Sequence, residues 1–155
     1  MDPFVLLKRD HKRLSAYFDD LFAAPSAEKR EDLYSQLRKD LKEHIELEER
    51  FFHPLLENHN RTLPSLQHAE EEFHQMRDVM RRLHRSRTMD HRWLQELSRL
   101  HDLVKHHVRD DRRTFAQVDD LLNYHQQQDI GDQMIQRKEK KHQGLWRKIT
   151  DFFSR

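Results

Sequence analysis

The sequence lacks cysteine and holds very little glycine or proline. With no cysteine among its 155 residues, the chain cannot form disulfides, iron–sulfur clusters or cysteine zinc sites, and it has no thiol nucleophile. Two glycines and four prolines are too few for an all-β protein with many tight turns. The composition therefore favours helix, and the length favours one domain.

The chain also lacks a strong charge bias and long hydrophobic runs. Its 29 basic residues nearly balance 28 acidic ones, which gives no indication of a nucleic-acid partner. The first apolar run, Phe4–Leu7, is far shorter than that of a signal peptide, and no run is long enough for a membrane span. We expect a cytoplasmic protein.

Apolar residues at helical spacing predict four long helices. Pro3, Ser26, Pro64 and Asp90 mark their starts, and the predicted helices cover residues 3–23, 27–58, 64–86 and 90–122. Because short connections force long neighbouring helices to run antiparallel, the pattern predicts an all-α, up-down-up-down antiparallel four-helix bundle over residues 1–124.

Residues 125–155 form a different segment, which we interpret as a basic C-terminal amphipathic tail. From Asp132 onward it has seven basic and three acidic residues, and its apolar residues predict one face of an extra helix: Leu145, Trp146, Ile149, Phe152 and Phe153. Three roles stay open for residues 132–155: packing on its own bundle, packing on a second copy in a homodimer, or contact with a membrane surface or target protein.

Thirteen histidines stand out, and some fall on the apolar stripes that predict the core. His11 interrupts the first stripe, His44 and Glu48 the second, and His107 and Asp111 the fourth. Unpaired buried charge is very costly, so these groups must pair with one another, accept and donate hydrogen bonds, or bind a cation. A self-paired polar core is the alternative to a metal site.

An internal repeat extends this set. Shifting the sequence by 63 residues maps His44 onto His107, Glu48 onto Asp111 and His11 onto His74, and Glu70 lies one turn before His74. Seven candidate metal ligands result: His11, His44, Glu48, Glu70, His74, His107 and Asp111. Seven nitrogen and oxygen ligands without thiols suit two metal ions that share carboxylates, with iron or manganese favoured and zinc an alternative.

The stretches around these residues resemble the hemerythrin family, in particular the bacterial hemerythrin-like domains that bind cations. They are Asp10–Leu14, His44–Pro54, Glu72–Arg77 and His107–Asp111, and the resemblance covers residues 3–122. It implies a non-heme di-iron centre that the carboxylates of Glu48 and Asp111 bridge together with a solvent-derived oxygen.

Glu70 departs from the oxygen-carrying members, which have a histidine at that place, and this argues against reversible oxygen carriage. The resemblance then implies a protein that binds or senses O2, a related small oxidant such as peroxide or nitric oxide, or iron itself. An enzyme acting on peroxide or nitric oxide is one alternative, although the sequence supplies no obvious general acid. The other is an interaction protein that metal stabilises and that works through its tail.

Overall fold

The computed structural model describes residues 1–86 and 90–154, with the backbone alone for Leu145, Trp146 and Ile149. The described residues form helices and no strands, which confirms the predicted all-α class. The helices are α1 (Pro3–Ala23), α2 (Ala27–Phe51), α3 (His53–Glu57), α4 (Leu63–Ser86), α5 (His91–Leu121) and α6 (Tyr124–Ser154). The proposed apolar contacts of Leu145, Trp146 and Ile149 in the tail lie outside the described side chains.

Local sequence sets most helix starts where the pattern predicts them. The Asp2 carboxylate accepts the Phe4 N–H at 2.8 Å, Ser26 Oγ accepts the Lys29 N–H at 3.2 Å, and Asp90 accepts the Trp93 N–H at 3.1 Å. These bonds satisfy backbone donors that have no partner inside the first turn of a helix.

The second predicted helix does not run unbroken to residue 58. It ends at Phe51, and the short α3 continues from His53 to Glu57 with Pro54 in its first turn. Proline has no N–H to donate and its ring clashes with the carbonyl four residues earlier, so a helix cannot pass through Pro54 undisturbed.

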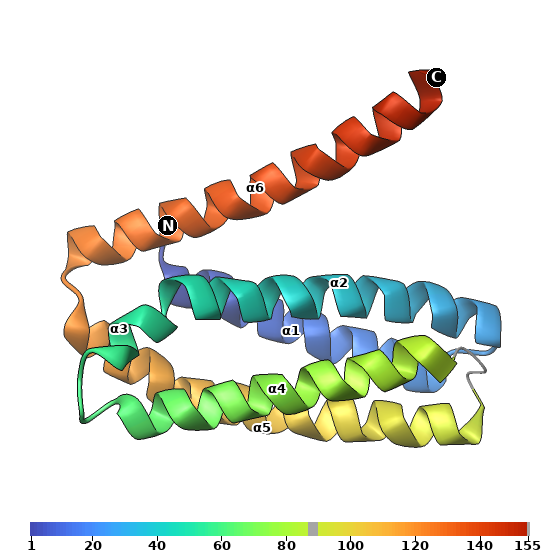
Figure 1. The fold of residues 1–155 in the computed structure, drawn as a ribbon, viewed down its shortest axis with the longest axis horizontal. Helices are drawn as coiled ribbons and strands as arrows, with labels where there is room; N and C mark the ends of the chain where they lie inside the picture. Colours follow the sequence, from blue (N-terminus) through green and yellow to red (C-terminus); the bar gives the residue numbers. More distant parts are fainter. Residues whose placement is uncertain (87–89, 155) are drawn as a thin grey trace.

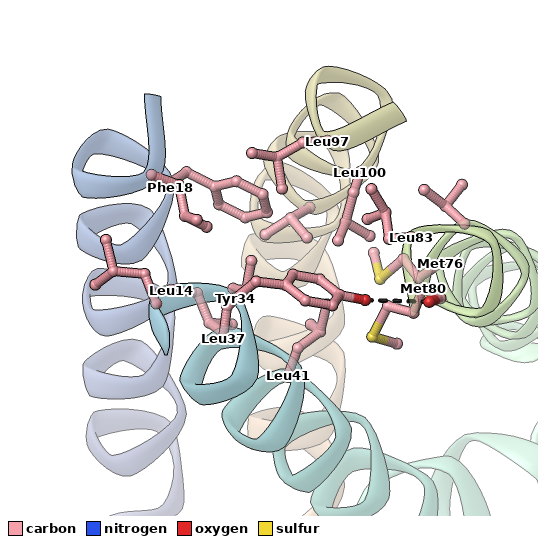
Figure 2. Packing of buried hydrophobic residues seen from close by; sticks show 14 of the residues in the cluster. Leu14, Phe18, Tyr34, Leu37, Leu41, Met76, Met80, Leu83, Leu97 and Leu100 are labelled. Carbon is pink, nitrogen blue, oxygen red and sulfur yellow. Dashed lines mark hydrogen bonds between the residues drawn. The ribbon is translucent and has the colours of Figure 1, made fainter. Parts of the chain in front are cut away.

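The four long helices α1, α2, α4 and α5 lie side by side, as a helical bundle requires (Figure 1). Leucine, phenylalanine and methionine side chains from all four interdigitate in one apolar cluster (Figure 2). Within it, the Tyr34 hydroxyl donates to the Met80 carbonyl at 3.1 Å, and burial raises the pKa of Tyr34 to about 12. Trp93 Nε1 donates likewise to the Leu83 carbonyl, which ties the start of α5 to the end of α4.

A second apolar cluster fills the other end of the bundle. It contains Phe4, Phe52 and Phe115, whose rings lie within 5.7 Å of one another, and Met134 of α6. Between the two clusters lies a layer that includes His11, His44 and His107. A polar layer enclosed by apolar side chains on both sides has little access to water, so its interactions with ions are strong.

The segment from Tyr124 to Ser154 is one continuous helix of 31 residues, longer than the stretch of apolar residues that predicts it. Figure 1 shows that α6 runs along the side of the bundle formed by α1 and α2 and that its C-terminal end points away from it. Gly131 allows α6 to approach the chain start, because a Cβ there would overlap the Met1 carbonyl. None of the described helices is long and apolar enough to cross a membrane.

Candidate metal centre

Three helices bring five ionisable side chains to one place in the core. His11 comes from α1, His44 and Glu48 lie one turn apart on α2, and His107 and Asp111 lie one turn apart on α5. Residues four apart project from the same face of a helix, so each pair points into the bundle together. One donor atom from each of the five side chains lies within 4.8 Å of all the others.

The closest contacts in this inner cluster join imidazole nitrogens to carboxylate oxygens. His107 Nε2 lies 2.8 Å from Glu48 Oε2 and 2.9 Å from Asp111 Oδ2. His11 Nε2 lies 2.8 Å from the same Asp111 oxygen, and His44 Nε2 lies 3.6 Å from Glu48 Oε2. Three imidazoles thus converge on two carboxylates.

These atoms are buried, and although they form close ion pairs, the contacts do not have the geometry of hydrogen bonds. His44, Glu48, His107 and Asp111 are each no more than 2% exposed, and His11 is 9% exposed. Among the described residues, no hydrogen bond reaches Nε2 of the three histidines, either carboxylate oxygen of Glu48, or Asp111 Oδ2. Such unsatisfied polar atoms are costly unless a cation binds them, and the mixture of imidazole and carboxylate donors fits a transition-metal ion.

The charges in the metal-free cluster are tightly coupled. Burial disfavours the charged form of His107, but the neighbouring Glu48 and Asp111 outweigh it and raise the pKa of His107 well above its ordinary value. Burial and repulsion from Asp111 raise the pKa of Glu48 to about 7. Burial lowers the pKa of His11 despite its contact with Asp111. His107 therefore carries the positive charge that a metal ion would replace.

A chain of polar contacts links the inner cluster to α6. His44 Nδ1 donates to Asp10 Oδ2 at 3.2 Å, and Lys138 Nζ of α6 donates to Asp10 Oδ1 at 2.6 Å. Burial opposes the charged form of Asp10, but His44 and Lys138 prevail and lower its pKa. A carboxylate that accepts the second N–H of a metal-binding imidazole fixes the orientation of the ring and raises its basicity.

Aromatic side chains flank two of the imidazoles. Phe115 stacks on His11 with centroids 5.8 Å apart, and Phe73 of α4 lies 4.7 Å from His107. His53 is also buried and stacks on Phe73, and burial lowers its pKa to about 4.

The structure does not bring the other two predicted ligands, Glu70 and His74, to the inner cluster. Both are exposed on α4; the His74 side chain is 65% exposed and lies 3.5 Å from Asp78 instead. The residues of α4 that are buried at the corresponding level are Ala69, Glu72 and Phe73, and of these only Glu72 has a side chain that can bind a metal. A helix turns about 100° per residue, so a displacement of one position is enough to remove a side chain from the core.

Sequence reasoning also missed polar residues around the cluster. Asp10 precedes His11, and Lys138 lies in a segment read as a separate tail, so neither carries a local signal. Glu72 is buried on α4, with Oε1 3.8 Å from His107 Nδ1. Its signal was available in the sequence, because Glu72 follows His68 by one helical turn.

A helical bundle with three histidines and two carboxylates converging in its interior defines the chain as a candidate metal-binding helical protein. The family model of the hemerythrin HHE cation binding domain matches residues 2–118, which is more than half of the chain. The chain therefore belongs to this family. Comparison with curated proteins finds no match, and neither does comparison with solved structures.

Proposed function

We propose that the protein holds a single iron ion in the inner cluster. The observation that carries the proposal is the set of five buried donors, three imidazole nitrogens and two carboxylate oxygens, within 4.8 Å of one another. Five donors leave one position of an octahedral ion free, and this donor mixture suits non-heme iron, with manganese or zinc as alternatives.

A single ion replaces the di-iron centre that the family resemblance implies. A pair of ions bridged by Glu48 and Asp111 needs further ligands, and Glu72 is the one buried side chain of α4 at this level among the described residues that could supply one. His107 already contacts both carboxylates through Nε2. The five donors suffice for one ion and leave a second one short of ligands.

The free position makes a small ligand the natural partner, and O2, peroxide and nitric oxide are the candidates. A cavity of about 410 Å³ reaches His11 and has apolar walls that include Phe18, Val104 and Val108. Lys105, Arg109 and Arg112 also line it. An iron ion bound in the cluster would supply redox chemistry and a coordination position, and this cavity would give a small molecule a path to His11.

Sensing fits the surroundings of the cluster better than turnover. The contact from His44 through Asp10 to Lys138 joins the inner cluster to α6, so the charge at the centre acts on how α6 docks. The enzyme alternative is distinguished by steady consumption of peroxide or nitric oxide in the presence of a reductant, whereas a sensor binds once per chain.

The direct test is metal analysis and an absorption spectrum of protein purified without chelator. We expect about one iron per chain and a ferric spectrum without the near-ultraviolet bands of an oxo-bridged pair. His74→Ala is the matched control, because it removes an exposed histidine that lies outside the inner cluster. Protein that retains no metal after anaerobic loading with ferrous iron contradicts the proposal.

A role in association through α6 is the second candidate. The first part of α6 is docked through Met134, while Phe152 and Phe153 near its end are 77% and 81% exposed. We propose that this end packs on another copy of the chain, which is one of the three roles that the sequence leaves open for the tail. Ending the chain after Tyr124 should yield a metal-loaded monomer by light scattering. A full-length protein that is itself monomeric contradicts the dimer, and binding to anionic vesicles would indicate a membrane surface instead.

A further inference from the structure

A cavity between α1 and α5 combines an apolar floor with a charged rim. We call it the α1–α5 cavity; it holds about 410 Å³, within the range of about 300–1,000 Å³ that sites for small organic molecules have. Phe18 of α1 and Val104 of α5 are 0% and 4% exposed, and Val108 packs against the same apolar cluster. The His101 ring stacks on Phe18 with centroids 4.5 Å apart and extends this floor. Hydrocarbon is more stable on such a floor than in water.

Three basic side chains form the rim of the α1–α5 cavity. Lys105, Arg109 and Arg112 follow one another at intervals of one turn along α5, and all three are exposed. Among the described residues, no carboxylate lines this cavity, and none forms an ion pair with the three rim side chains. Like charges that share a rim without acidic partners repel one another, and a bound anion relieves that repulsion.

Two other cavities of the bundle carry acidic side chains. The cavity that contains His107 has three carboxylates in its lining. The cavity between α2 and α4 is lined by Glu46 and Glu49 as well as basic residues, and Glu49 pairs with Arg77 there. Of these three cavities, the α1–α5 cavity is therefore the one whose charge favours an anion.

We propose that the α1–α5 cavity binds a free monocarboxylate with an apolar chain of about eight carbons. The carboxylate accepts hydrogen bonds at the rim from Arg109 and Arg112, because the planar guanidinium group matches the two oxygens of a carboxylate. The chain lies on the apolar floor below. The rim from Lys105 to Arg112 covers about 10 Å of helix, which is close to the length of an extended eight-carbon chain.

The bound carboxylate would also cover the approach to the inner cluster, since His11 lines the same cavity. An occupied cavity would then close the path by which a small molecule reaches His11. The contacts that hold the carboxylate need no metal ion, so its binding is measured on the metal-free protein. Octanoate binding and iron content are separate quantities, and the failure of either proposal leaves the other standing.

The test is isothermal titration calorimetry of the metal-free full-length protein with octanoate. Two further ligands separate the contributions of charge and chain: acetate carries the carboxylate without the chain, and 1-octanol carries the chain without the charge. Octanoate should bind once per chain, and acetate and 1-octanol should each bind at least about tenfold more weakly.

The rim variant is Arg109→Gln/Arg112→Gln, which removes two of the three basic groups. Its matched control is Arg92→Gln/Arg99→Gln, which removes two charges at exposed positions of α5 outside the cavity lining. The rim variant should bind octanoate about tenfold more weakly, and the control should bind it as the wild type does. Circular dichroism confirms that both variants are folded.

Three results would overturn the carboxylate site. The first is a wild type that does not bind octanoate. The second is an equal loss of affinity in the rim variant and the control, which would show that net charge alone matters. The third is acetate or 1-octanol binding as tightly as octanoate, because the cavity would then not use charge and chain together.

Discussion

At one level of the bundle, helices α2 and α5 contribute metal-binding side chains to the core, whereas α4 contributes mainly apolar ones. The first two each present a histidine and a carboxylate one turn apart, His44 with Glu48 and His107 with Asp111. At that level, α4 presents Ala69 and Phe73 to the core, and its own histidine and carboxylate, His68 and Glu72, lie toward one edge. All five donors of the inner cluster therefore come from α1, α2 and α5, which is why we expect one ion in it rather than two.

The largest effect should come from removing one of the proposed metal-binding histidines of α2 or α5. His44→Ala or His107→Ala should abolish tight metal binding, because the inner cluster loses one of three imidazoles. His107→Ala should also destabilise the metal-free protein by about 3–5 kcal/mol, since Glu48 and Asp111 lose the positive charge between them. Metal analysis and urea unfolding measure the two effects. Unchanged stoichiometry in both variants would remove the inner cluster from consideration.

Adding histidines to the core face of α4 should create the ligands that a second ion needs. The double variant Ala69→His/Phe73→His should raise the iron content from one ion per chain to two, because α4 would then supply two imidazoles beside His107. Burying imidazoles in an apolar site should cost the metal-free protein about 1–3 kcal/mol. Glu70→His is the matched control, and at its exposed position it should change neither quantity. A gain of an ion with Glu70→His alone would show that α4 is rotated in solution.

Metal affinity should fall as the pH falls. An ion must displace the proton from His107, whose pKa is raised well above its ordinary value, and, below about pH 7, also the proton from Glu48, whose pKa is raised to about 7. Both groups bind protons more readily as the pH drops, so each proton displaced should weaken the binding by about tenfold per pH unit. Competition titrations with Co²⁺ at pH 8, 7 and 6 measure this slope. An affinity that stays constant over this range contradicts the charge assignment.

The smallest effect should come from the α6 contact. Lys138→Ala removes the donor to Asp10 and should weaken metal binding by about tenfold, because the carboxylate that orients His44 loses its partner. Lys140→Ala, an exposed position on the same helix, is the control. If both variants bind metal equally well, the inner cluster is independent of α6.

Composition and the hydrophobic pattern predicted the all-α class, the helix starts and the five polar side chains that meet in the inner cluster. These side chains could be found because each interrupts a stripe whose other members are buried, as His11 does between Leu7 and Leu14. Because apolar residues precede and follow the polar residue on the same stripe, the pattern predicts that the polar residue also points into the core.

The expectation for α4 rested on the repeat instead, and the repeat is not uniform. A shift of 63 residues relates His44 to His107, but the apolar stripe of α1 maps onto that of α4 with a shift of 62, which places His11 on Phe73. The sequence left the docking of the tail on its own bundle as one of three open roles and could not single it out. It depends on contacts of Met134 and Lys138 with residues more than a hundred positions away.

Quantitative electron paramagnetic resonance of the iron-loaded protein tests the central claim most directly. A lone ferric ion is paramagnetic, whereas two ferric ions coupled through a bridge cancel their spins. After anaerobic loading with ferrous iron, removal of loosely bound metal and oxidation with ferricyanide, the protein should show about one ferric spin per iron and one iron per chain. Two irons per chain without a ferric resonance signal would contradict a centre that holds a single ion.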